Sequence, residues 1–339
     1  MTANAVTNRV FYFTGPRKWE IRDEPCPPPG PGQIRAKTIC SMVSIGTESI
    51  CYVRDVEKGS NWDKWIEYPF HPGYLTVGEV TEVGAGVTDI KPGERVYSGV
   101  EHRAWFIEEA RKAMKIPDGL SSEEACWTAL NTVVQLGIRE VGPEMGQVSV
   151  VIGLGPLGQL AVRLLGLCGQ THVIAVDPIA ARCEMAKGHG ATVVLAGNAD
   201  QTEEKIKELT RGRGADNVFD ITGNPAVFHL AHRLLCRRGK LGLIGDVPKP
   251  TMQTLTHDVL FKSISIVGSH GITALWEGND FFRWGRKQMA EFFYDMILAK
   301  RINLKNLFTH RIKPTEAGKI YDDLQVNRGA YMGIIIDWT

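Results

Sequence analysis

The sequence predicts an α/β protein built from a β-rich domain and a doubly wound parallel sheet, and three observations support this. The 339 residues are enough for about two globular domains. Strand and turn signals fill the first part of the chain, and strand and helix signals alternate over residues 126–283. Residues 284–339 begin with a helical pattern and end in strand-like GIIIDW. We therefore expect 1–125 with 284–339 to form the β-rich domain and 126–283 the parallel-sheet domain.

The β-rich part opens with a proline-rich turn that runs into an alternating strand at QIRAKTI. Two further strands are expected around Gly84, Gly86 and the turn at residues 91–93. Ser121 and Ser122 precede Glu124, which is typical of a helix N-terminus.

The parallel-sheet part begins with a strand at 148–152, a GxGxxG turn, an apolar helix and a second strand at 173–176. Gly153 permits a tight turn, Gly155 lets the backbone approach a pyrophosphate, and Gly158 lets the helix pack close to the sheet. Pro156 has no N–H, so the residues after it, beginning with Leu157, must donate to the anion. In this context the motif predicts a Rossmann dinucleotide-binding domain.

The choice of dinucleotide depends on Asp177, nineteen residues after Gly158 at the end of the second strand. A carboxylate there accepts hydrogen bonds from both hydroxyls of an adenosine ribose and repels a 2′-phosphate, which favours NAD. Arg182 keeps NADP open, since its guanidinium could reach that phosphate. Later strands are expected at 192–195, 217–221, 240–244 and 263–267. The turns after two of them add small residues against the cofactor, namely Thr222, Gly223 and Gly245.

Composition excludes several other classes of protein. The 39 basic and 38 acidic residues form no basic stripe, which argues against nucleic-acid and membrane-surface partners. No apolar segment approaches membrane-spanning length, and the first residues do not resemble a signal peptide. Seven cysteines without framework spacing indicate a reducing, cytoplasmic location.

Several phrases, among them PGYLTVGEVTEVGAGVTDIKPGERV and LFTHRIKPTEAGKIYDDL, resemble the medium-chain dehydrogenase/reductase superfamily over essentially the whole chain. The resemblance implies a GroES-like catalytic domain, NAD in the cleft beside a Rossmann domain, and a homodimer extended through the strand at 263–267.

Alcohol dehydrogenases of this superfamily hold a catalytic zinc, but the matching positions here carry Ile45 and, in Gly73-Tyr74-Leu75, no Cys or His. Ile and Leu cannot ligate zinc, and neutral Tyr is a poor ligand. The third ligand position falls near Thr128, although Cys126 is close enough to restore one ligand. The four-cysteine lobe of a structural zinc is also missing. We expect a zinc-independent member with no metal.

Four residues are therefore candidates for catalysis. By the resemblance, Thr47 hydrogen-bonds the reacting oxygen, and Tyr74 replaces a metal ligand with a phenol whose lowered pKa would suit acid or base catalysis. Glu48 could tune either group, and His102 could reach the same cleft. Each also has an ordinary explanation: Thr47 as the cap of a helix beginning near Glu48, Tyr74 as packing, Glu48 as a supporting residue and His102 as a surface-loop histidine. His71 is expected in a turn, and six cysteines as buried apolar residues: Cys40, Cys51, Cys126, Cys168, Cys183 and Cys236.

The expected reaction is NAD-dependent oxidation of a secondary alcohol to a ketone. The SIGTE segment resembles the bacteriochlorophyllide dehydrogenase-like branch, and sorbitol and threonine dehydrogenase-like substrates stay open. Aromatic residues could wall a flat pocket or form an interface: Trp62, Trp65, Tyr68, Phe70, Trp276, Phe281, Phe282 and Trp284. The alternatives are an NAD(P)H-dependent reductase of an activated C=C bond and a dinucleotide-binding protein without turnover.

Overall fold

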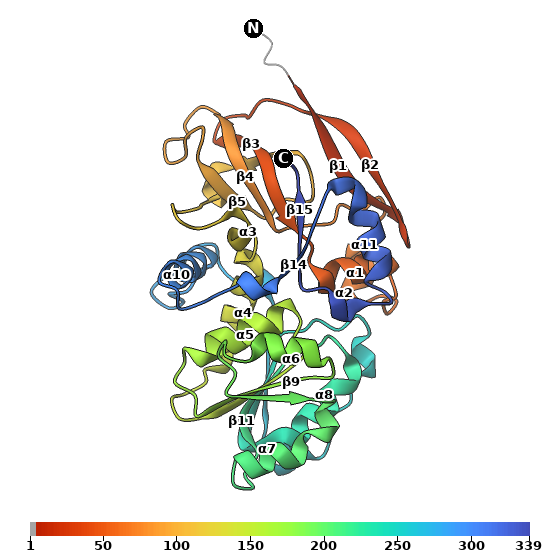
Figure 1. The fold of residues 1–339 in the computed structure, drawn as a ribbon, viewed down its shortest axis with the longest axis vertical. Helices are drawn as coiled ribbons and strands as arrows, with labels where there is room; N and C mark the ends of the chain where they lie inside the picture. Colours follow the sequence, from red (N-terminus) through yellow and green to blue (C-terminus); the bar gives the residue numbers. More distant parts are fainter. Residues whose placement is uncertain (1–4) are drawn as a thin grey trace. The chain divides into compact units, whose positions relative to one another are not determined.

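The computed structural model describes residues 5–339, which form two compact units. The first unit comprises residues 5–55, 61–129 and 276–339, and the second comprises 56–60 and 130–275. Figure 1 shows both units, with the first containing the chain's red, orange and blue segments and the second its green segments.

The second unit is built on a six-stranded parallel sheet with strand order β10-β9-β8-β11-β12-β13. Every strand expected in this part of the sequence is present, so the doubly wound fold class is confirmed. The order reverses between β8 and β11, and ligands of such sheets bind at the carboxyl ends of the strands beside this point. The strands are β8 (Val148–Ile152), β9 (His172–Asp177), β10 (Val193–Ala196), β11 (Ala215–Asp220), β12 (Leu235–Leu243) and β13 (Ser265–Gly268).

Helices cover both faces of this sheet. α5 (Pro156–Gly166) and α6 (Ala180–Ala186) lie on one face, and α7 (Glu203–Leu209) and α8 (Pro225–Leu234) lie on the other (Figure 1). α4 (Thr128–Val141) precedes the sheet, and α9 (Asp258–Phe261) precedes β13. Residues with no exposed surface, including Val150, Ile174 and Val218, form the core between these layers. Strands buried on both faces explain the continuous apolar runs in the sequence.

The start of β12 differs from the expectation. The strand begins at Leu235, five positions before the predicted range of 240–244. Its pairing with β11 changes register between Ala215 and Asn217, and Arg238 has a positive φ of 61°. The bulged part of the strand contains two exposed arginines and a glycine. These residues interrupt the apolar pattern, so the sequence does not indicate that the strand begins at Leu235.

The first unit contains a seven-stranded sheet, ordered β14-β15-β3-β4-β5-β7 with β6 paired to β3, and a separate β1-β2 hairpin. The C-terminal strand β15 pairs antiparallel with β3, which places the end of the chain in this sheet. The strands are β1 (Val6–Gly15), β2 (Lys18–Cys26), β3 (Gln33–Met42), β4 (Thr76–Val83), β5 (Arg95–Ser98), β6 (Trp105–Glu109), β7 (Met114–Lys115), β14 (Phe308–Ile312) and β15 (Gly333–Asp337).

The helices of the first unit are α1 (Ile45–Val53), α2 (Asn61–Trp65), α3 (Ser122–Ala125), α10 (Arg286–Leu298) and α11 (Ala317–Asp323). Ser121 caps α3 in a capping box with Glu124, which confirms the predicted N-terminus. α10 confirms the helix expected after residue 284.

All eight tryptophans and all eight tyrosines of the chain belong to the first unit. Four of its rings, those of Phe11, Phe13, Tyr52 and Tyr321, pack together with centroids 4.9 to 5.8 Å apart in the contacts that link them. The second unit packs its sheet with aliphatic side chains and a few phenylalanines.

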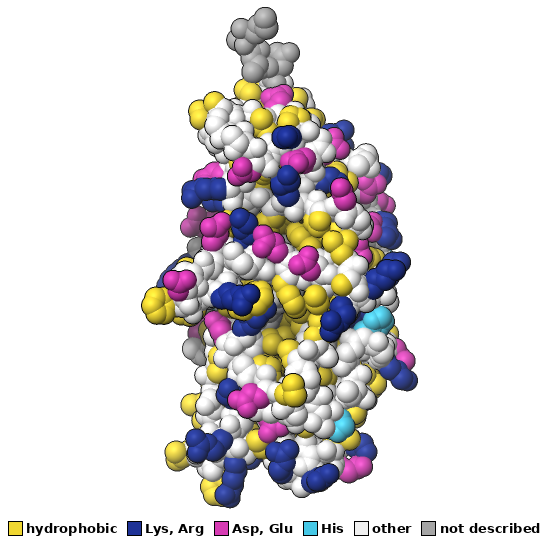
Figure 2. All heavy atoms as spheres, turned by 90° about the vertical axis from the view of Figure 1, so that its left-hand side faces the viewer, with side chains coloured by type: hydrophobic (Ala, Val, Ile, Leu, Met, Phe, Trp, Pro, Cys, Tyr) yellow, Lys and Arg dark blue, Asp and Glu magenta, His cyan; other side chains and the backbone are white. Residues whose placement is uncertain are grey.

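Within the described part of the chain, helices fall short of the length and apolarity needed to cross a membrane. Figure 2 shows basic and acidic side chains distributed over one face of the molecule, so neither sign of charge dominates that face. All seven cysteines are free thiols, and Cys168 is half-buried while the other six are buried.

Candidate active site

The glycine turn after β8 has the shape that the motif predicts. Gly153 has a positive φ of 90°, and a Cβ at Gly158 would lie 1.9 Å from the Gly153 carbonyl oxygen. A Cβ at Gly155 would meet nothing within 4 Å, so the space in front of this residue is open. The helix therefore starts against the turn while one glycine faces free space, as a pyrophosphate site requires.

α5 starts at Pro156, with Gly155 as its N-cap. The hydrogen bond from Gln159 N–H to the Gly155 carbonyl opens the helix, which leaves the N–H groups of Leu157 and Gly158 without a helical acceptor. These groups can donate to an anion, and the helix dipole favours a negative charge at the same point.

Asp177 ends β9 and is only 3% exposed. One carboxylate oxygen accepts from the Leu154 N–H at 2.7 Å and the other from the Ile179 N–H at 2.8 Å. The Arg182 guanidinium lies 3.8 Å from the same carboxylate. Asp177 thus holds the glycine turn in place from the end of β9.

The turns after β11 and β12 meet the glycine turn. A Cβ at Gly153 would lie 2.8 Å from Thr222 Cγ2, and one at Gly245 would lie 2.5 Å from the Gly223 nitrogen. The Thr222 hydroxyl donates to Asp220 Oδ1 at 2.7 Å, and burial raises the pKa of Asp220. The small residues that the sequence assigned to cofactor contact therefore lie together at the carboxyl ends of three strands.

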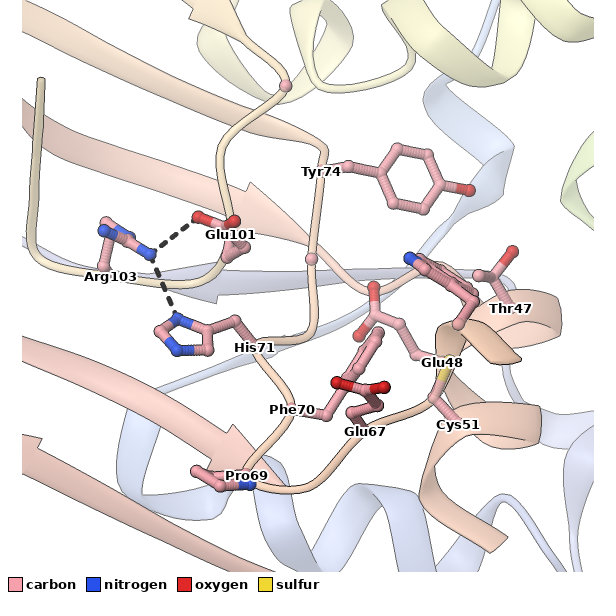
Figure 3. A pocket seen from close by; sticks show the side chains of 13 residues that line it. Thr47, Glu48, Cys51, Glu67, Pro69, Phe70, His71, Tyr74, Glu101 and Arg103 are labelled. Carbon is pink, nitrogen blue, oxygen red and sulfur yellow. Dashed lines mark hydrogen bonds and ion pairs between the residues drawn. The ribbon is translucent and has the colours of Figure 1, made fainter. Parts of the chain in front are cut away.

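A second site lies in the first unit, where a pocket of about 570 Å³ opens beside α1. Thr47, Glu48 and Tyr74 line it, as do several residues that the sequence did not single out for a site. Figure 3 shows Thr47 and Tyr74 at one end of the view and Glu101, Arg103 and His71 at the other.

The Tyr74 hydroxyl lies 2.7 Å from the Ser44 hydroxyl. Burial raises the pKa of Tyr74, and the hydroxyls of Ser44 and Thr47 act in the opposite sense without reversing the shift. The expectation of a lowered phenol pKa is therefore wrong, because the site is desolvated and holds no cation next to the phenol oxygen. Tyr74 stays a protonated donor and acceptor at neutral pH.

Glu48 is 1% exposed and anchors a buried network. One carboxylate oxygen accepts from the Ser44 N–H at 2.8 Å, and the other contacts His102 Nε2 at 3.1 Å and accepts from the Tyr321 hydroxyl. His102 Nδ1 lies 2.8 Å from the Ser41 hydroxyl. His102 has no exposed surface, so its interpretation as a surface-loop histidine is wrong: the segment folds inward against α1.

Thr47 does not cap a helix. α1 begins at Ile45 with Ser44 as its N-cap, so Thr47 lies in the first turn, half-buried against the pocket. The helix starts earlier than expected because Glu48 accepts the Ser44 N–H and so satisfies a free donor of the first turn. The Thr47 side chain then faces the pocket beside the Tyr74 hydroxyl.

His71, Glu101 and Arg103 form a cluster that the sequence analysis missed. Arg103 donates to Glu101 at 2.6 Å and lies 3.3 Å from His71 Nδ1. Burial and the neighbouring Arg103 lower the pKa of His71, which lines the pocket and is more than a turn residue. Alternation along residues 101–103, which precede β6, could have placed Glu101 and Arg103 on one side of the chain and His102 on the other.

Only part of the expected aromatic wall lines this pocket. Trp65 and Phe70 do so, with ring centroids 5.1 Å apart. Trp62 is buried, and the Tyr68 hydroxyl donates to the Cys51 carbonyl. Phe281 and Phe282 are 92% and 70% exposed and lie outside the pocket.

Of the two positions expected to ligate zinc in relatives, one carries buried Ile45 and the other carries Tyr74, which is followed by buried Leu75. Cys126 lies 3.6 Å from Cys40, sulfur to sulfur, and burial raises the pKa of Cys126 well above its usual range. Over residues 5–339, no three His, Cys, Asp or Glu side chains gather as a metal site requires. Two buried thiols do not provide a zinc donor set.

Comparison with known proteins agrees with this architecture. Residues 41–136 match the alcohol dehydrogenase GroES-like domain, and residues 156–283 match the zinc-binding dehydrogenase domain. D-guloside 3-dehydrogenase of Escherichia coli (strain K12) is 31% identical over 244 residues, covering 70% of this chain and 69% of the relative. The chain belongs to the medium-chain dehydrogenase/reductase superfamily.

L-Threonine 3-dehydrogenase of Bacillus licheniformis is 25% identical over 329 residues, covering 86% of each chain. The structure of a zinc-binding dehydrogenase from Sinorhizobium meliloti 1021 bound to NADP has a TM-score of 0.80 and 19% identity, covering 98% of this chain and 99% of the other. As a medium-chain dehydrogenase/reductase, this protein is an oxidoreductase of the alcohol dehydrogenase type that uses a nicotinamide dinucleotide.

Proposed function

We propose that this protein oxidises a secondary alcohol to a ketone, with NAD as the hydride acceptor and without a catalytic zinc. The observation that carries the proposal is the cluster of the Thr47, Tyr74 and Ser44 hydroxyls at the pocket, with Ile45 and Tyr74 at the positions expected to ligate zinc in relatives. The names of the two similar enzymes denote dehydrogenation at carbon 3, which in a guloside and in threonine is a secondary carbinol.

The preference for NAD is supported by Asp177. Its carboxylate stands at the end of β9 with both oxygens fixed by backbone N–H groups, and a 2′-phosphate there would meet a negative charge. Arg182 is already drawn to this carboxylate at 3.8 Å, which reduces its value to a phosphate. Because the similar structure from Sinorhizobium meliloti holds NADP, the dissociation constants of NAD and NADP must both be measured to test this preference.

The bound dinucleotide supplies the hydride acceptor, and the chain's own residues manage the proton. Tyr74 remains a neutral phenol at pH 7, so its hydroxyl acts as a relay that takes the alcohol proton while passing on its own. Ser44 holds the phenol at 2.7 Å, and Thr47 orients the alcohol oxygen. Glu48 positions α1 through Ser44, His102 and Tyr321. The proton leaves to water through the open pocket.

The test is NADH formation by the purified protein with NAD and a panel of polyols, cyclitols and benzylic alcohols, with and without a strong chelator. Turnover that resists the chelator supports the proposal. Turnover lost to the chelator would contradict zinc independence and direct attention to Cys126. An enone reduced by NADH, with no alcohol oxidised, would replace the proposal with C=C reduction. NADH binding without any turnover would indicate a protein that only binds the dinucleotide.

The homodimer is proposed on the edge strand β13. This strand ends the six-stranded sheet, and its neighbours expose large apolar side chains: Leu260 at 87%, Phe261 at 68% and Ile272 at 76%. An edge strand offers unpaired backbone groups to a second copy. Light scattering of the wild type against Ile266→Lys would test it, with a dimer that persists in the variant counting against this edge. We further propose a cytoplasmic location, supported by the seven free thiols.

A further inference from the structure

The charged groups of the pocket in the first unit select for the charge of a ligand. Among the described residues that line the pocket, Arg103 is the only Lys or Arg side chain. Its guanidinium is paired with the Glu101 carboxylate at 2.6 Å. His71 is uncharged at neutral pH, since burial and the neighbouring Arg103 lower its pKa. A phosphate or carboxylate entering the pocket would find no free cation with which to pair.

The same lining carries an excess of carboxylates. Glu67 is exposed to the pocket and, within residues 5–339, forms no ion pair. Glu48 is held by its buried partners, and Glu101 keeps lone pairs beyond those used by Arg103. These oxygens repel anions and accept hydrogen bonds from hydroxyl groups.

One wall of the pocket is aromatic. Trp65 is 53% exposed, and its ring packs against Phe70 and Trp62 at centroid distances of 5.1 and 5.7 Å. An indole anchored in this way offers an apolar face to a ligand. A purely hydrocarbon ligand would also cover Glu67, Glu101 and Arg103, which would then lose water without gaining hydrogen bonds.

We propose that the pocket binds an uncharged polyhydroxylated ring, of the glycoside or cyclitol class. The ring's C–H face packs on Trp65, and its hydroxyl groups donate to the carboxylates of Glu67 and Glu101 and accept from the Arg103 guanidinium. Phosphorylated and carboxylated sugars are excluded by charge. The inference rests on the proposed function for the reaction itself, whereas binding of the ring can be measured without turnover.

The experiment measures ligand binding to the protein saturated with NADH, by calorimetry and ligand-detected NMR. The ligands are a methyl hexopyranoside, myo-inositol, a hexose 6-phosphate, a hexuronate and 1-phenylethanol. The neutral rings should bind at least tenfold more tightly than the phosphate and the uronate, the difference expected from one unpaired charge. Tighter binding of either anion, or no binding of any neutral ring, would overturn the inference.

Three pocket variants and one control variant locate the effect. Trp65→Ala and Glu67→Gln should each weaken neutral-ring binding about tenfold, as expected for one lost ring contact or one hydrogen bond to a charged group. Glu67→Lys should improve hexose 6-phosphate binding by a similar factor. Glu291→Gln, on an exposed position of α10, removes one negative charge outside the pocket and should change nothing. Equal effects of Glu67→Gln and Glu291→Gln would assign the result to net charge and refute the pocket.

Binding and turnover separate the two proposals. If neutral rings bind but no NADH forms from NAD, the proposed function fails and the pocket assignment stands. If 1-phenylethanol is oxidised while neutral rings neither bind nor react, the pocket assignment fails and the alcohol oxidation stands.

Discussion

Two glycines of one motif are predicted to respond to the same substitution in opposite ways. A Cβ at Gly158 would lie 1.9 Å from the Gly153 carbonyl oxygen, so Gly158→Ala forces two backbone segments apart by about 1 Å to reach a tolerable 3.0 Å. Overpacking of this kind costs about 1–3 kcal/mol. For a domain of this size that corresponds to a melting temperature lower by roughly 2–12 °C.

Gly155→Ala meets nothing within 4 Å, and Gly155 has an ordinary φ of −67°. The free energy of unfolding of the Gly155→Ala variant should change by less than about 0.5 kcal/mol. The lower conformational entropy of its unfolded chain offsets the loss of stability from a poorer N-cap. The methyl group instead occupies the space in front of the helix, and NADH affinity should fall by about tenfold or more, or ~1.4 kcal/mol.

Calorimetry without ligand and a titration with NADH would measure both quantities for both variants. The expected pattern is a large thermal loss for Gly158→Ala, and a loss of binding at constant stability for Gly155→Ala. Equal thermal loss in the two variants, or unchanged NADH affinity for Gly155→Ala, would refute the assignment of the open space to the pyrophosphate.

Three more predictions concern the two sites. Tyr74→Phe should lower kcat more than it raises KM for the alcohol, because the phenol that Ser44 holds moves a proton in the reaction; wild-type activity in the variant would make Tyr74 a packing residue. Asp177→Ala should lower the ratio of the NADP dissociation constant to the NAD dissociation constant. A variant that only loosened the glycine turn would weaken the binding of both dinucleotides and leave this ratio unchanged. Burial raises the pKa of Tyr68 to about 12, and burial with the Glu24 carboxylate raises that of Tyr12 to about 12. The hydrogen bond to the Asp323 carboxylate, with burial, raises the pKa of Tyr331 to about 12. The folded state therefore favours the protonated phenols, and stability that is complete below pH 10 should fall as pH rises from 10 to about 12, followed by circular dichroism; a flat profile there would contradict these shifts.

The sequence predicted the parallel-sheet unit well because its signals are local. The strand, glycine turn and helix of residues 148–166 each follow from neighbouring residues, and so does the Ser121–Glu124 capping box. The place of Asp177 at the end of β9 also follows from spacing. The hydrogen bond of Asp177 to the Leu154 N–H, which fixes the glycine turn, does not, because only the pairing of β8 with β9 brings the two together.

The pocket was harder to predict because its members meet across long stretches of chain. Glu48 reaches His102 and Tyr321, fifty-four and 273 positions away. The periodicity of one segment cannot predict a contact with a distant segment. His102 lies between two charged residues, a pattern that is typical of an exposed loop. Ser44 could not be predicted as a site residue for a related reason, since its hydroxyl contacts the phenol of Tyr74 on another segment of the chain.

The confinement of every tryptophan and tyrosine to the first unit gives the protein a built-in optical label. Intrinsic fluorescence and near-ultraviolet dichroism will follow the unit that holds the pocket, while far-ultraviolet dichroism and calorimetry follow both. If the units unfold separately, damage to the glycine turn, as in Gly158→Ala, will leave tryptophan emission unchanged during the first transition. Unlabelled protein is then sufficient to determine which half of the enzyme melts first and which half a given substrate or dinucleotide stabilises.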